Sequence, residues 1–101
     1  MKALLINPVA QSIQEVDITG YEDIIDLIGY TTLTSDELTP SGHRLFFDEE
    51  CFLRGTRGRF QLDRLIPVSG KAVIALADKD ASVIRDVNIN TALLEGRIKF
   101  I

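Results

Sequence analysis

The stretch from Ala72 to Ala77 is the longest uninterrupted apolar run in the 101-residue chain, and it limits the possible folds more than any other feature. It is far shorter than the roughly 20 apolar residues that a helix needs to cross a bilayer. An apolar run of this length instead fits a short central strand that is buried on both faces. We therefore predict a globular domain built around a sheet, with residues 70–77 forming a central strand and no contact with a membrane.

Other short segments predict the strands around this one. They are rich in apolar, β-branched or aromatic residues, which favour strands. Only four residues separate the first two segments, which predicts an antiparallel hairpin. Polar stretches rich in turn residues predict a loop at 34–42 and turns at 48–50 and 78–80. The predicted strands comprise residues 2–7, 12–18, 30–34, 43–47 and the tail at 97–101.

The clearest helix signal lies at residues 20–28. Thr19 and Glu22 have the spacing of a capping box, and Gly29 is placed to end the helix in the left-handed conformation. The apolar residues recur at the i, i+3, i+4 and i+7 positions of one helical face. The side chains predicted to be buried on this face are those of Tyr21, Ile24, Ile25 and Ile28.

A second, shorter helix is predicted to run through Leu94, with Asn88 or Asn90 as its N-cap and Gly96 at its end. Strands and helices alternate irregularly, and several connections are too short for parallel crossovers. We therefore predict an α+β fold in which residues 1–101 form one domain. Its mixed or antiparallel sheet has about five or six short strands, with one or two short helices packed on one face.

Counts of reactive residues argue against most enzyme chemistries. Cys51 is the only cysteine and His43 the only histidine, so neither a multi-thiolate nor a two-histidine metal site can form. A nucleophilic Cys51–His43 pair is conceivable, but a lone cysteine is more often a small buried apolar residue. Leu65 stands where a phosphate-binding P-loop ending at Gly70 and Lys71 would need glycine. We therefore expect no enzyme activity, no catalytic residue, no cofactor and no metal.

Cysteine content and the N-terminal sequence favour a reduced, cytoplasmic location. A single cysteine cannot form an intramolecular disulfide. The apolar stretch after Lys2 ends at Asn7 and Pro8, which is too short for the apolar region of a signal peptide.

Residues 54–64 contain the best candidate for a binding site. Arginine side chains match phosphate oxygens in a bidentate manner, and the interspersed Gly55 and Gly58 allow backbone N–H groups to approach an anion. An aromatic ring beside them can stack on a base. The alternative is a solvated loop whose arginines pair with the acidic turn at 48–50. The candidate binding residues are Arg54, Arg57, Arg59, Phe60 and Arg64.

Charge is unevenly distributed along the chain. Residues 1–50 hold ten acidic and two basic residues, whereas residues 51–101 hold five acidic and nine basic ones. Such asymmetry can mark separate partner surfaces, although two halves that fold together can also neutralise each other. The acidic turn at 48–50 has oxygen ligands suited to Mg²⁺ or Ca²⁺, but it lacks the EF-hand spacing and is interpreted as a solvated turn.

Three stretches resemble a family of small domains of unknown function found in phage, plasmid and bacterial genomes. Residues 1–18 are similar to that family's first hairpin, which leads into a helix. Residues 45–55 are similar to its strand and acidic turn, and residues 69–80 to its glycine-led apolar strand. Cys51 stands where glycine is expected, and residues 54–60 replace an asparagine-containing segment. The resemblance implies an accessory protein of a mobile element and carries over no catalytic residue.

The sequence favours two alternative functions. The first is a non-enzymatic accessory or protein-interaction protein, whose partner is another protein of unknown identity. The second is a nucleic-acid or nucleotide-phosphate binder that uses the basic loop at 54–64. Binding to nucleic acid would weaken steeply with salt, by roughly 0.7–0.9 log units per log unit of salt for each phosphate contacted.

Overall fold

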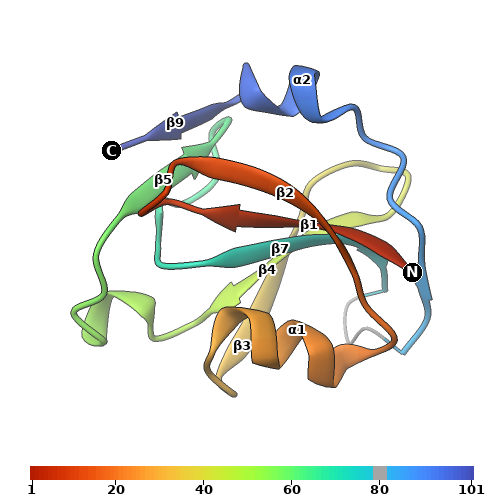
Figure 1. Ribbon diagram of the computed structural model, residues 1–101, viewed down its shortest axis with the longest axis horizontal. Helices are drawn as coiled ribbons and strands as arrows, with labels where there is room; N and C mark the ends of the chain where they lie inside the picture. Colours follow the sequence, from red (N-terminus) through yellow and green to blue (C-terminus); the bar gives the residue numbers. More distant parts are fainter. Residues whose placement is uncertain (79–81) are drawn as a thin grey trace.

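The computed structural model describes residues 1–78 and 82–101, and its main feature is an antiparallel sheet (Figure 1). Every strand pair in this sheet is antiparallel, so the antiparallel form of the α+β prediction is confirmed. The predicted turn at 78–80 lies outside the described residues except for Asp78. In spatial order the strands are β2 (Ser12–Asp17), β1 (Lys2–Asn7), β7 (Ala72–Ala77), β4 (His43–Asp48) and β3 (Leu33–Glu37), and β8 (Ile84–Arg85) pairs with the end of β7.

The strand β7 lies at the centre, between β1 and β4, as its apolar sequence predicts. Successive side chains of a strand point to opposite faces of the sheet, so an apolar run supplies core residues to both faces. Ala72 and Ile74 pack on one face, whereas Val73 and Ala75 pack on the other, and all four are fully buried. Two separate layers must therefore cover the sheet.

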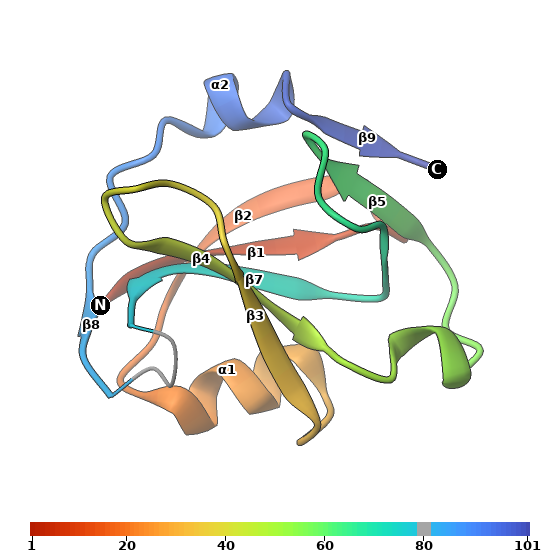
Figure 2. The same ribbon diagram turned by 180° about the vertical axis from the view of Figure 1, so that it is seen from behind.

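One of these layers is a second, smaller sheet together with a short helix. The helix α2 (Thr91–Glu95) lies with this sheet on the face of the main sheet opposite the longer helix (Figures 1 and 2). Phe60, Leu62 and Leu94 of this layer meet Leu4 and Ile74 of the main sheet in one apolar cluster. The strands of the small sheet are, in order, β6 (Val68–Ser69), β5 (Arg59–Leu62) and β9 (Ile98–Phe100).

The other layer is the helix α1 (Tyr21–Ile28), which confirms the helix predicted at 20–28. Gly29 ends it with a φ of 93°, as predicted for a left-handed cap. The predicted capping box is wrong, because the N-cap is Gly20 and not Thr19. The helix begins one residue later, so the carboxylate at the third helical position is that of Asp23. This carboxylate accepts hydrogen bonds of 2.7 Å from the backbone N–H and the hydroxyl of Thr19.

The buried face of α1 also differs from the prediction. Ile24 and Ile28 are buried, but Ile25 is only partly buried and lies outside the apolar cluster that Leu27 joins. Ile25 and Leu27 flank the central pair on opposite sides of the helix, so periodicity alone allows either to complete the face. Packing against β4 and β7 rotates the helix toward Leu27.

Substitutions on this helix should separate the two flanks. Ile24→Ala should lower the free energy of unfolding by about 2–5 kcal/mol, because the deletion leaves a cavity in a fully buried site. Ile25→Ala should cost about 1 kcal/mol or less, since its side chain is partly in water. Urea unfolding of both variants checks the difference, and a larger loss for Ile25→Ala would refute the observed helix face.

The strand predicted at 30–34 lies instead at Leu33–Glu37 as β3, so the loop predicted at 34–42 is confined to residues 38–42. An edge strand exposes one side to water and therefore tolerates polar residues that resemble a loop in sequence. The strand predicted at 43–47 is confirmed as β4.

Asn90 and not Asn88 caps α2, and its side chain accepts a 2.8 Å hydrogen bond from the N–H of Ala92. No helix among the described residues is long and apolar enough to cross a membrane.

Candidate functional site

Arg54, the first arginine of the basic loop, belongs to the scaffold. Its guanidinium lies 3.0 Å from Asp48 and 3.3 Å from Glu50. It also donates a 3.0 Å hydrogen bond to the hydroxyl of Thr32 and lies 4.4 Å from the centre of the Tyr30 ring. The alternative in which arginines pair with the acidic turn therefore holds for Arg54. This residue ties the end of β4 to the segment that precedes β3.

Asp48 is the buried member of this network, with 3% of its surface exposed. Burial raises the pKa of its carboxyl, but this effect is outweighed by hydrogen bonds from the Thr32 hydroxyl, the Arg54 guanidinium and the Glu50 backbone N–H. The net result is a lowered pKa, because these donors favour the charged form. The same contacts raise the pKa of Arg54, chiefly through its hydrogen bond with Asp48. Both groups are held charged and paired.

Phe60 cannot act as the predicted stacking surface. It is fully buried in the apolar cluster between the two sheets. Along β5 the side chains alternate, so that Phe60 and Leu62 are buried while Arg59 is exposed. The sequence of residues 59–62 carries this alternation of polar and apolar residues, which would have indicated a strand in place of the end of a loop.

The remaining arginines do not converge on one point. The guanidinium of Arg59 lies 5.2 Å from the centre of the Phe52 ring, and Arg57 lies in the loop before β5. Arg64 lies in the turn at the other end of β5. Within residues 1–78 and 82–101, neither Arg57 nor Arg64 forms an ion pair or a hydrogen bond through its side chain. The five predicted residues therefore do not form a single site.

Two exposed apolar side chains precede Arg57 and Arg59 in the chain, and one of them, that of Phe52, lies against Arg59. They belong to the short 3-10 helix η1 (Cys51–Leu53), where Phe52 is 49% exposed and Leu53 is 83% exposed. We refer to Phe52, Leu53, Arg57 and Arg59 as the contact surface. Phe52 and Leu53 were not among the predicted site residues, because two apolar residues after a turn are more often buried than exposed in the sequence pattern of a small domain.

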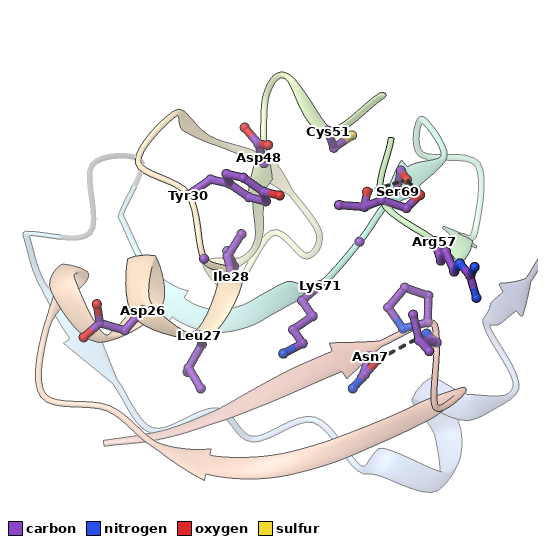
Figure 3. Close-up of a pocket in the computed structure, with 15 residues that line it drawn as sticks. Asn7, Asp26, Leu27, Ile28, Tyr30, Asp48, Cys51, Arg57, Ser69 and Lys71 are labelled. Atoms are coloured by element: carbon purple, nitrogen blue, oxygen red, sulfur yellow. Dashed lines mark hydrogen bonds between the residues drawn. The ribbon is translucent and has the colours of Figure 1, made fainter. Parts of the chain in front are cut away.

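Next to the contact surface is a cavity of about 390 Å³. Figure 3 shows the segments that surround it: the turn between β1 and β2, the C-terminal end of α1, the end of β4, η1, the basic loop and the turn before β7. Arg57 is the only predicted site residue that lines it among the described residues. The principal side chains on its wall are those of Asn7, Leu27, Tyr30, Arg57, Ser69 and Lys71.

The basic loop is fixed against the cavity by close backbone contacts. Gly58 has a φ of 80°, and a Cβ atom at this position would lie 2.9 Å from backbone atoms of Pro8 and Val9. The N–H of Gly70 donates a 3.1 Å hydrogen bond to the carbonyl of Gly58. Thr56 and Ser69 join their hydroxyls at 3.0 Å. Gly58 therefore serves close packing of the loop, and the cavity wall is held in place before any ligand arrives.

His43 and Cys51 are too far apart to act as a pair. His43 begins β4 and Cys51 follows its end, so at about 3.3 Å per residue the strand separates them by roughly 15 Å or more. Cys51 is 4% exposed and belongs to an apolar cluster. The structure thus gives this cysteine the surroundings of a small buried apolar residue.

His43 is held in its neutral form by its neighbours. Its Nε2 accepts a 3.4 Å hydrogen bond from the backbone N–H of Asn88, so the ring proton lies on Nδ1, which is 2.9 Å from the Thr39 hydroxyl. Burial lowers the pKa of this imidazole, because the charged form loses its hydration. The residue connects the start of β4 to the segment that leads to α2.

This arrangement predicts a pH dependence of stability. The unfolded chain takes up a proton at His43 near its ordinary pKa of 6.5, whereas the folded chain does so only at lower pH. Stability should therefore be complete above about pH 6.5 and fall as the pH drops toward the lowered pKa. Urea unfolding at pH 7.5 and 5.5 should show the loss, and His43→Gln should remove most of it. An unchanged pH slope in the variant would refute this role.

Among the described residues, no group of three histidine, cysteine, aspartate or glutamate side chains is arranged to hold a metal ion. The site is therefore characterised by its arginines, its exposed apolar side chains and its cavity. The chain matches no model of a protein family, no curated protein and no solved structure.

Proposed function

We propose that the protein is a non-enzymatic binding protein that engages a partner protein through the contact surface. The observation that carries this proposal is the exposure of Phe52 and Leu53, with Arg59 placed over the Phe52 ring. Aromatic residues and arginine are enriched at protein interfaces, where a few such side chains supply most of the binding energy. The arrangement of Arg59 over the exposed Phe52 ring has the composition of such a patch.

The energetics favour a partner that covers Leu53. Removing one leucine side chain from water contributes roughly 1.5–3 kcal/mol. Arg59 is already positioned over Phe52, so part of the entropic cost of ordering its long side chain is met before binding. Its guanidinium and that of Arg57 remain available to carboxylates of a partner at the edge of the patch.

We also propose that this binding protein is an accessory protein of a phage or other mobile element and works in the cytoplasm. The resemblance of residues 1–18, 45–55 and 69–80 to a domain family of such elements supports the first part. The reduced setting indicated by the single Cys51 supports the second.

Binding to nucleic acid or a nucleotide phosphate is the second candidate. It is supported by Arg57 and Arg64, whose side chains form no ion pair with other described residues. Two of the five predicted contacts, however, are occupied elsewhere, since Arg54 pairs with Asp48 and Phe60 is buried. The acidic first half of the chain also opposes a polyanion over roughly a Debye length of 8–10 Å. The protein partner is therefore the preferred proposal.

Affinity capture with two matched variants tests the choice. Partners are captured from a host extract, with and without nuclease, by the unaltered chain and by the variants Leu53→Ser and Leu93→Ser. Leu93 is 70% exposed on α2, away from the contact surface, and serves as the control. We expect one protein, identified by mass spectrometry, that survives nuclease, is retained by Leu93→Ser and is lost with Leu53→Ser. Capture that depends on nucleic acid, or that ignores Leu53→Ser, would overturn the proposal.

A further inference from the structure

The charges around the cavity do not cancel. Its wall contains two acidic and two basic side chains, those of Asp26, Asp48, Arg57 and Lys71. Asp48 is already neutralised by Arg54. Figure 3 shows the carboxylate of Asp26 directed away from the other labelled side chains, whereas Lys71 extends between Leu27 and Asn7. The balance facing the cavity is therefore positive, and Lys71 supplies it.

Three hydrogen-bond donors on the cavity wall are without an acceptor in the part of the chain that the structure describes. The side-chain oxygen of Asn7 accepts from the N–H groups of Val9 and Ala10 at 3.1 and 3.3 Å, which leaves its NH₂ group as a donor. Among the described residues, that NH₂ group, the Tyr30 hydroxyl and the Lys71 ammonium group have no hydrogen-bond acceptor. The hydroxyls of Thr56 and Ser69 are occupied by each other. Such a surplus of donors suits a ligand that is rich in acceptors.

The rest of the wall is apolar and sets the size of the ligand. Its apolar residues are Leu27, Ile28, Pro8 and Val9. A volume of about 390 Å³ lies near the lower end of small-molecule sites, which span roughly 300–1,000 Å³. Figure 3 shows Arg57 at the rim, with its guanidinium directed outward, where it can attract an anion from solution.

We propose that this cavity binds a small molecule in which a carboxylate or phosphate group is attached to a compact apolar body. The anionic group lies against Lys71 and the NH₂ group of Asn7, and the apolar body lies against Leu27 and Ile28. The proposal goes beyond the proposed function, because it concerns a different surface and does not require a partner protein. The hydrogen bonds that hold Gly58 and Ser69 in place make the site preformed.

A titration of the full chain with phenyl phosphate, followed by amide NMR spectra, tests the proposal. Saturable shifts are expected at Asn7, at residues 27–30 and at residues 69–71, with a dissociation constant of about 1 mM or tighter for a ligand of this size. Benzoate should bind at the same residues. Benzyl alcohol, which lacks the charge, should bind at least about tenfold more weakly. Shifts that do not saturate, or equal affinity for the alcohol, would overturn the proposal.

Variants distinguish this site from other surfaces. Lys71→Gln should weaken phenyl phosphate binding by about tenfold. Lys99→Gln is the matched control, since Lys99 is an exposed lysine on β9, and it should change affinity by less than about twofold. Leu53→Ser should leave phenyl phosphate binding intact, so failure of this proposal and failure of the partner proposal are separate results. Equal losses for Lys71→Gln and Lys99→Gln would refute the assignment.

Discussion

Asp48→Ala should lower the free energy of unfolding by about 3–5 kcal/mol. Asp48 is 3% exposed and accepts hydrogen bonds from the Thr32 hydroxyl, the Glu50 N–H and the Arg54 guanidinium. Removing the Asp48 carboxylate is strongly destabilising, because the buried donors that it satisfies lose their acceptor and Arg54 loses its shorter ion pair. Urea unfolding at neutral pH measures the loss.

Glu49→Ala provides the control for this substitution. Glu49 is the exposed neighbour of Asp48, and its removal should change stability by less than about 0.5 kcal/mol. The lowered pKa of Asp48 adds a second signature: its contribution is complete above its ordinary pKa of 3.8 and is lost as the pH falls below that value. Similar effects of the two alanine substitutions would show that the Asp48–Arg54 network does not hold the end of β4.

Phe60→Ala should also cost about 3–5 kcal/mol, because it opens a cavity in the cluster that joins the two sheets. Phe52→Ala is the informative comparison, since Phe52 is 49% exposed and contacts Arg59 on the surface. That substitution should cost less than about 1 kcal/mol. Thermal and urea unfolding of both variants check the contrast. A small loss of stability for Phe60→Ala would mean that this ring is not a core residue and can be a ligand contact, as the basic sequence around it predicts.

Elements with a clear pattern of apolar residues were predictable from the sequence. The first hairpin, the helix at 20–28 and the central strand at 72–77 each combine a clear apolar pattern with a clear end, such as Asn7 or Gly29. In these segments the conformational preference of the residues and the pattern of burial favour the same structure. Packing against the rest of the chain therefore does not change the predicted element. The short helix before Gly96 was predictable for the same reason, through its cap at Asn90.

Features that depend on neighbours were not predictable. Whether Ile25 or Leu27 completes the buried face of α1 is decided by the strands beneath it. The polar strand β3 forms because β4 has an edge without another partner strand. The sequence of residues 33–37 alone does not show that this edge is available. The small sheet joins residues 59–62 to residues 98–100, and neither segment's own sequence shows that the other is its partner.

The candidate site shows the same division. Clustered arginines and glycines identified the basic loop, but only the structure separates Arg54, which holds Asp48, from Arg57 and Arg59, which face solvent. The cavity is formed by segments as distant as Asn7 and Lys71. No local motif joins such segments, because they meet only through the order of strands in the sheet.

The most direct test of the proposed function is the affinity of the captured partner for three versions of the chain. Isothermal titration calorimetry of the purified partner should give a dissociation constant at least about tenfold weaker for Leu53→Ser than for the unaltered chain, a loss of about 1.4 kcal/mol. Leu93→Ser should bind within about twofold of the unaltered chain. Equal affinities for all three proteins would contradict a function that resides in the contact surface.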